Sequence, residues 1–321
     1  MSIFRFKPLL QETIWGGNKI AEMKHLDTAD ASIGESWELS GVEGHETVVA
    51  EGKYEGMPLN TLVKKMGEQL VGEANYQRFG DTFPLLIKFI DARDDLSIQV
   101  HPDDETAHRQ GKACGKTEMW YAMESAPDAK LYNGLKSAIS PETFARKVAD
   151  NTITDALAQY TVGEGDVFFI PAGRVHAIGK GCFVAEIQQT SDITYRIYDF
   201  DRRDKNGNRR QLHTAEAAEC IDYSVLPDYR THYDPTQSVR TRIASCPYFT
   251  TNVITATSFV NLDCIHIDSF IILICVKGEG RVTLTDGESC GIKAGETVLL
   301  PATTEYYYIE GETTLLETYI V

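Results

Sequence analysis

The sequence predicts a mainly β protein made of two related β-sandwich or jelly-roll domains with a few short helices. Most of the chain consists of short runs of β-branched and aromatic residues separated by Gly, Asp and Asn turns, a pattern typical of antiparallel sandwiches. One such unit also occurs twice, at 165–176 and at 295–306. Recurrence of a strand and its turns indicates two β-domains of related structure.

Three segments are expected to be helical. They are 59–72 (LNTLVKKMGEQLVG), 141–160, which opens with the start signal Ser140-Pro141, and 213–222 (HTAEAAECID). The polar stretch 199–211, DFDRRDKNGNRRQ, is the best candidate for a linker or surface loop.

The repeated unit distinguishes the two domains. GDVFFIPAGRVH and GETVLLPATTEY both begin with a Gly-acid turn, continue as an apolar strand and reach Pro-Ala, where the strand should stop. His176 at the end of the first copy is replaced by Glu305-Tyr306 in the second. We therefore expect a first domain over 1–240, with N-terminal strands and helical insertions, that carries the functional site, and a C-terminal β-domain over 241–321 that lacks metal ligands.

Composition limits the possible partners and compartments. A formal net charge of −16 argues against binding to nucleic acid in general or to anionic membranes. The N-terminus lacks a signal-peptide h-region, and no apolar run approaches the roughly 20 residues of a membrane span. Seven scattered cysteines without a CxxC pair fit reduced thiols. We expect a cytoplasmic protein; the sequence does not determine its oligomeric state.

Polar side chains in apolar strands mark a candidate site. Gln99 and His101, two residues apart, project from the same strand face. The simplest interpretation of His101 alone is a hydrogen-bonded core histidine. Glu118, at the start of a second apolar strand, and His176 change this interpretation, since two imidazoles and a carboxylate suit Zn²⁺ or Fe²⁺. Gln99 would be a neutral oxygen donor or a neighbour of the ligands.

Several motifs together resemble a known family. The spacing Gly-x5-Pro-x-Gly-x2-His is similar to a metal-binding motif of the cupin superfamily, and Gln99-Val-His101 stands where cupins usually have His-x-His. ETIWGG, IGESWELSG, LSIQVHPDDE, GKTEMWYAM, IPAGRVHAI and SDITYRIYDF, in this order, resemble type I mannose-6-phosphate isomerases in their short bacterial form. The resemblance covers most of the chain, from about residue 8 to 321.

This resemblance implies a zinc enzyme that interconverts mannose 6-phosphate and fructose 6-phosphate through an enediol. The implied ligands of one Zn²⁺ per chain are Gln99, His101, Glu118 and His176. The implied catalytic residues are Lys116, Glu186 and Arg196, although the usual Lys-Pro-Glu is Lys-Thr-Glu here. Arg202 stands where long members of the family have a lysine, and Ile178 stands where they have a tyrosine.

The chemistry of these residues suggests roles. Glu186 is the first candidate for the proton-shuttling base, with a pKa raised by burial, although it could also be a strand carboxylate paired with a cation. Lys116 and Arg196 would orient the sugar or bind its phosphate, and Asp192 would hold Arg196 in place.

Further cations and the acidic HPDDE tail have simpler interpretations. Lys88, Arg93 and Arg202 are additional substrate-binding candidates, but each is more simply explained as a solvated surface charge. The HPDDE tail is best explained as a turn with a helix N-cap.

Two alternatives remain open at this point. Two His and one carboxylate also describe the Fe²⁺ site of a cupin oxygenase, and a sugar-binding cupin need not be catalytic. Gln99, Lys116 and Arg196 favour a phosphorylated sugar over oxygen chemistry. The expected partner is therefore a small sugar phosphate.

Overall fold

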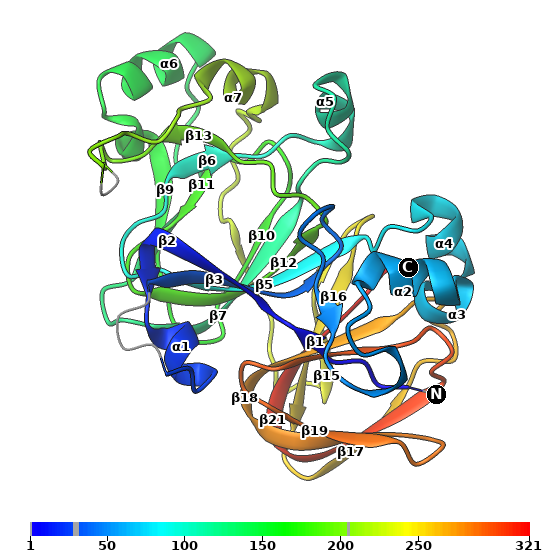
Figure 1. Ribbon diagram of the computed structural model, residues 1–321. Coiled ribbons are helices and arrows are strands. Elements are labelled where there is room, and N and C mark those ends of the chain that lie inside the picture. The colour runs from blue at the N-terminus through cyan, green and yellow to red at the C-terminus, as the bar shows by residue number, and fades with distance from the viewer. Residues whose placement is uncertain (1, 28–31, 204–205) are drawn as a thin grey trace.

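A computed structural model describes residues 2–27, 32–203 and 206–321, and it confirms a mainly β fold with a few short helices (Figure 1). Two β-sheets lie in the N-terminal part of the chain, and a third is built from the C-terminal part. Helices α5, α6 and α7 gather at the end of the molecule away from the C-terminal sheet.

The two N-terminal sheets pack face to face. The larger has the strand order β14-β10-β7-β12-β5-β3-β2, and the smaller has the order β13-β6-β11-β8-β9. Side chains of both sheets, such as Trp120 and Val184 from one and Leu131 and Ile178 from the other, share one buried cluster. The strands of the larger sheet are β2 (Leu9–Gly17), β3 (Ile33–Ser40), β5 (Leu85–Asp91), β7 (Glu118–Ser125), β10 (Val167–Ile170), β12 (Cys182–Gln189) and β14 (Arg230–Thr231). Those of the smaller sheet are β6 (Ile98–Val100), β8 (Lys130–Leu135), β9 (Leu157–Thr161), β11 (His176–Ile178) and β13 (Tyr195–Tyr198).

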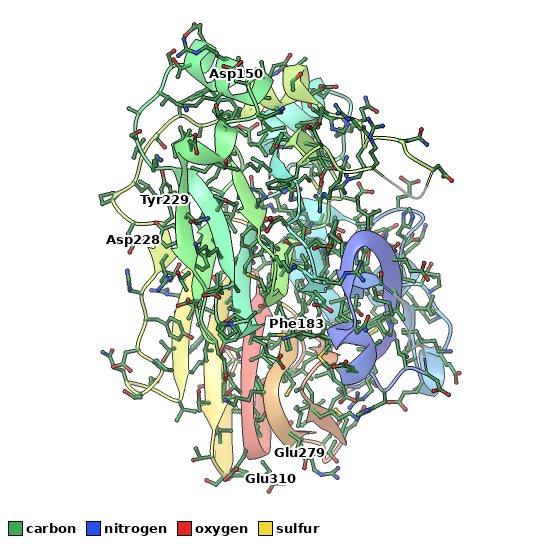
Figure 2. All side chains as sticks on the ribbon, turned by 90° about the vertical axis from the view of Figure 1, so that its left-hand side faces the viewer. Asp150, Phe183, Asp228, Tyr229, Glu279 and Glu310 are labelled. Atoms are coloured by element: carbon green, nitrogen blue, oxygen red, sulfur yellow. The ribbon has the colours of Figure 1, made fainter. Side chains whose placement is uncertain are left out.

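The C-terminal sheet is organised around two long strands. β18 pairs with β19, β20 and β21, and β21 pairs with β16, β17 and β18. The strands are β15 (Arg240–Ser245), β16 (Thr250–Ala256), β17 (Phe259–Asp263), β18 (Ile271–Leu284), β19 (Ser289–Lys293), β20 (Thr297–Leu300) and β21 (Tyr306–Tyr319). They enclose their own apolar cluster, which includes the fully buried Tyr307. Glu279 and Glu310 lie at one end of the molecule, and Asp150 of the helical layer lies at the other (Figure 2).

The N-terminal segment and a shared core join the two halves. β1 (Phe6–Lys7) pairs with β4 (Val48–Val49), and just before it Phe4 pairs with Leu299 of the C-terminal sheet. The rings of Phe83 and Phe270 lie 4.6 Å apart within one cluster that draws on both halves. The domain division at 240/241 stays a prediction.

The repeated unit has the same backbone in both copies. β10 and β20 each follow a glycine with positive φ, Gly165 at 85° and Gly295 at 87°, and each ends directly before a proline. A positive φ at the turn requires glycine, which explains why both copies begin with it. The next strand begins at His176 in the first copy and at Tyr306 in the second.

The helices correct part of the sequence prediction. The segment 59–72 divides at Gly67, whose φ of 54° ends the first helix, and a further helix over 73–79 was missed. The prediction for 141–160 is wrong in its second half: the helix ends at Ala149, Asn151 has a φ of 56°, and Leu157–Thr161 pairs with β8 as a strand. Pairing with a neighbouring strand overrode a weak helical pattern.

Two other local predictions are confirmed. The third expected helix is α7, and Asp103 in HPDDE accepts a hydrogen bond from the Thr106 amide as the N-cap of α5. The helices are α1 (Lys19–Met23), α2 (Leu59–Met66), α3 (Glu68–Val71), α4 (Glu73–Phe79), α5 (Asp104–Arg109), α6 (Pro141–Ala149) and α7 (Thr214–Cys220), with 3₁₀ turns at Gly52–Tyr54 and Ile153–Ala156.

Candidate metal centre

Three predicted metal ligands meet in the space between the two N-terminal sheets. His101 follows β6 and His176 begins β11, so both come from the smaller sheet, while Glu118 begins β7 of the larger sheet. Their potential ligand atoms all lie within 4.8 Å of one another. The exposed fractions of the three residues are 1%, 0% and 0%, which makes this candidate ligand cluster a buried one.

Both imidazoles present the same nitrogen to the cluster. His101 Nδ1 lies 2.7 Å from the Ile193 carbonyl oxygen, and His176 Nδ1 lies 2.8 Å from that of Arg174. Because a carbonyl can only accept, each Nδ1 carries the proton and each Nε2 keeps its lone pair, as in metal-binding histidines. Burial holds the pKa of His101 well below its usual range and lowers that of His176 to about 3. Both rings are therefore neutral at physiological pH.

Glu118 completes the cluster: its carboxylate oxygens, which accept hydrogen bonds, face the unprotonated Nε2 atoms of the two histidines. Its Oε1 lies 3.3 Å from His176 Nε2, and its Oε2 lies 3.5 Å from His101 Nε2. Oε1 is buried without a hydrogen-bond donor among the described residues. Burial, together with the nearby charge of Glu186, raises the pKa of Glu118 to about 7. Lone pairs that converge in a buried space fit a metal ion, which would relieve the cost of this arrangement.

Lys116 shows that the cluster attracts a cation. Its ammonium group donates to Glu118 Oε2 and lies 3.2 Å from His101 Nε2. This ammonium therefore interacts with two of the atoms that would bind a metal. A metal ion bound to the same atoms would displace the Lys116 ammonium from them.

Gln99 lies beside the cluster. Its amide Nε2 is 3.3 Å from His176 Nε2, and its Oε1 accepts a hydrogen bond from Ser97. The strand register places Gln99 opposite both His176 and Arg196, so these three side chains share one face of the smaller sheet. Its role as a fourth ligand stays a prediction.

A network of buried charges surrounds the cluster. Glu186, on β12, accepts a 2.8 Å hydrogen bond from the Trp120 indole and lies 3.5 Å from Lys88 and 3.8 Å from Lys116. Burial raises the pKa of Glu186, but the charges of Lys116 and Lys88 outweigh it and hold the pKa below 4.5. The expectation of a raised pKa for Glu186 is therefore wrong, because Lys88 on β5 and Lys116, just before β7, compensate its burial.

The surface-charge interpretation of Lys88 is also wrong. Lys88 is buried on β5, paired with Glu35 at 3.3 Å, and its ammonium lies over the Trp37 ring. Glu35, the partner of Lys88, was not predicted. The signal was present in the motif GESWELS, where Glu35 and Trp37 alternate on β3 and Trp37 pairs with Lys88.

The remaining cationic candidates separate into different environments. Arg93 is exposed, as expected of a surface charge. Arg196 is half-buried, with its Nε hidden from solvent and without a partner among the described residues. Asp192 is exposed and, within the described part of the chain, forms no ion pair with Arg196, so the structure does not support its predicted role in holding that arginine.

The stretch 199–211, predicted as a linker or surface loop, contains a buried ion-pair network beside a cavity. Arg202 and Arg210 both donate to the buried carboxylate of Asp199, and both line a cavity of about 950 Å³ between α6, α7 and β13. Residues 204 and 205 of this stretch lie outside the described residues. Asp199 and Arg210 were not predicted as candidates from the sequence.

None of the helices among the described residues is both long and apolar enough to cross a membrane.

Comparisons with known proteins agree with the geometry. Residues 3–133 match the family model described as phosphomannose isomerase type I, catalytic domain, and residues 239–320 match mannose-6-phosphate isomerase, cupin domain. The chain is 35% identical over 311 residues to mannose-6-phosphate isomerase ManA of Bacillus subtilis (strain 168), covering 95% of both chains. It is 32% identical to mannose-6-phosphate isomerase of Streptococcus mutans, covering 94% of this chain and 93% of that one.

Solved structures give the same result. The crystal structure of mannose 6-phosphate isomerase from Bacillus subtilis superposes with a TM-score of 0.87 at 30% identity, over 100% of both chains. A putative mannosephosphate isomerase from Archaeoglobus fulgidus has the same fold, with a TM-score of 0.81 at 24% identity over 99% of this chain and 98% of that one. The predicted family resemblance and fold class are thus confirmed.

Proposed function

This chain belongs to the type I mannose-6-phosphate isomerase family, and we propose that it is a zinc-dependent enzyme that interconverts mannose 6-phosphate and fructose 6-phosphate. The observation that carries the proposal is the unpartnered, fully buried Glu118 Oε1 facing a histidine lone pair, because this arrangement needs a cation. The proposed ligands are Gln99, His101, Glu118 and His176. Zinc, when bound there, would supply Lewis acidity to the sugar oxygens.

Glu186 is the proposed base. Conversion of an aldose into a ketose moves a proton between C1 and C2 through an enediol, so a group must accept and return that proton. The lowered pKa keeps Glu186 ionised at neutral pH, which suits a proton acceptor. Its Oε1 accepts no hydrogen bond from the described residues and has only the longer ion pairs to Lys88 and Lys116, so this oxygen would take up the proton. The Trp120 indole orients the other oxygen.

The positive charges of Lys116 and Lys88 lie next to the carboxylate of Glu186. Both ammonium groups lie within 4 Å of Glu186 Oε1, and they stabilise its ionised form before the proton is accepted. After proton transfer the same ammonium groups face a neutral acid, which favours return of the proton to the sugar. Lys116, which lies at the cluster, is also placed to donate a hydrogen bond to a sugar oxygen.

Arg196 and Arg202 are the proposed contacts for the phosphate group. Arg196 lies on the same sheet face as Gln99, next to the ligand cluster, and its guanidinium has no ion-pair partner among the described residues. Guanidinium groups bind phosphate with two parallel hydrogen bonds. The proposed division of the chain assigns catalysis to 1–240 and a structural role to 241–321.

The proposed location is the cytoplasm, because all seven cysteines are free. The family relationship and the buried lysines do not favour the two alternatives, an Fe²⁺ oxygenase and a non-catalytic sugar-binding cupin.

One experiment tests the function. Purified protein is incubated with mannose 6-phosphate, fructose 6-phosphate is followed in a coupled assay, and the assay is repeated after chelation and after addition of zinc. We expect turnover that chelation abolishes and zinc restores. Absence of turnover in zinc-loaded protein would refute the proposal.

Two variants test the assignment of residues. His176→Ala should lose both bound metal and activity, whereas Arg196→Ala should keep the metal and lose turnover. His232→Ala serves as a matched control, because His232 is exposed and pairs with Asp228. Full metal content in the His176 variant would show that the ligand set is wrong.

A further inference from the structure

One buried carboxylate organises the cationic groups at the end of β13. Asp199 follows this strand and is 6% exposed. Its Oδ1 accepts hydrogen bonds of 2.5 Å from both Arg202 and Arg210, and its Oδ2 accepts one of 2.8 Å from Arg210 Nε. Arg210 therefore binds both carboxylate oxygens of Asp199 with two parallel hydrogen bonds, and Arg202 donates to Oδ1 as well.

A second contact fixes Arg202. Its NH1 donates to the carbonyl oxygen of Asp95, in the loop that leads into β6. Arg202 is thus tied to the strand that carries Gln99. Both long side chains lose conformational freedom before any ligand arrives, which reduces the entropic cost of binding one.

Arg202 and Arg210 carry more positive charge than the single carboxylate of Asp199 neutralises. Arg196 lies on β13, three residues before Asp199. Burial and the positive charges of Arg210 and Arg202 lower its pKa, and the charge of Asp199 opposes them. Arg202 and Arg210 share one buried carboxylate, and the guanidinium of Arg196 has no ion pair among the described residues, so positive charge is in excess here in a protein whose formal charge is −16. Such an excess favours an anionic ligand.

Two members of the arginine cluster, defined as Arg196, Arg202 and Arg210, are accessible from a cavity. Arg202 and Arg210 line the cavity between α6, α7 and β13, and about a quarter of the Arg210 side chain is exposed. Arg196 lies beside Gln99 on the face of the candidate ligand cluster. Arg202 and Arg210 thus face the cavity, and Arg196 lies on the strand that pairs with the one carrying Gln99.

We propose that Asp199 is a positioning residue for the substrate phosphate: it holds Arg202 and Arg210 beside Arg196, so that the three guanidinium groups meet one phosphate group. This inference rests on the proposed function. It adds Asp199 and Arg210 to the site. Asp199 does not contact the phosphate; it acts through the two arginines.

The test is the variant Asp199→Asn, which keeps the shape and removes the charge. Zinc-loaded wild type and variant are compared for kcat and KM with mannose 6-phosphate and for inhibition by inorganic phosphate. We expect KM and the inhibition constant of phosphate each to rise about tenfold or more, while kcat changes by less than about twofold and zinc content is unchanged. A fall in kcat at unchanged KM would overturn the proposal.

The matched control is Asp201→Asn. Asp201 lies in the same loop, and its ion pair with Arg209 is exposed on both sides. This control should leave KM and phosphate inhibition unchanged. Equal effects of the two variants would overturn the assignment to Asp199.

A second variant guards against misfolding. If Asp199→Asn does not fold, Arg210→Gln, at a partly exposed position, should show the same split between KM and kcat, and an unchanged KM in this variant would overturn the proposal. If the wild type does not turn over mannose 6-phosphate, the proposed function fails. The positioning role is then tested by the rise in Tm that inorganic phosphate causes, which Asp199→Asn should abolish and Asp201→Asn should keep.

Discussion

The apparent affinity for zinc should depend on pH through a single carboxyl group. Glu118 has a pKa of about 7 in the metal-free protein, because it is fully buried and lies near Glu186. Only the ionised carboxylate binds a metal, so proton and metal compete for it and affinity rises with pH. The histidines do not take part in this range, since burial lowers the pKa of His176 to about 3 and that of His101 well below 6.5.

The size of the effect follows from this pKa. A carboxyl group with a pKa of about 7 is about nine-tenths ionised at pH 8 and about one-tenth ionised at pH 6, so zinc affinity should fall about tenfold between them. Two histidines with ordinary pKa values would add about a further tenfold or more. The slope therefore distinguishes one titrating group from three.

Competition with a chromogenic chelator at pH 6, 7 and 8 measures the affinity, and calorimetry in two buffers of different ionisation enthalpy counts the protons released. About one proton should leave at pH 6. The control variant Glu124→Gln, an exposed residue on the same strand, should keep the slope, whereas Glu118→Gln should abolish it. A flat profile, or release of two or more protons at pH 6, would refute the reasoning.

Three further predictions concern stability, measured as the free energy of unfolding in denaturant. Phe83→Ala should cost about 3–5 kcal/mol, because Phe83 is fully buried against Phe270 where the two halves share a core; a cost below about 1 kcal/mol would mean that this core is dispensable. Arg240→Ala should cost about 3 kcal/mol, because the fully buried Glu317 loses its two hydrogen bonds from Arg240. The control Arg242→Ala should cost little, because Arg242, two residues further along the same strand, is exposed. Gly134→Ala should cost about 1–3 kcal/mol, because Gly134 has a φ of 77° and an added Cβ would lie 2.2 Å from the ring of Tyr229, which Figure 2 labels; unchanged stability would contradict this packing.

Local pattern was a good guide to the strands and to the ligand types. Alternation along β6 placed Gln99 and His101 on one face, and the repeated Gly-x5-Pro unit identified two equivalent hairpin edges. Both depend on side-chain direction and turn conformation, which are properties of the nearest neighbours in the chain. The sequence pattern predicted a helix at 157–161, but pairing with β8 makes this segment a strand.

The sequence by itself determined which chemical groups are available: two imidazoles, several carboxylates, lysines and arginines at recognisable positions. Only the tertiary structure decided their state. The pKa of Glu186 is lowered and that of Glu118 is raised, although both are buried glutamates. Lys116, Lys88 and the Trp120 indole outweigh the burial of Glu186, whereas the charge of Glu186 adds to the burial of Glu118. Desolvation and Coulomb interactions depend on distances between strands that are far apart in the chain, so a single segment does not reveal them.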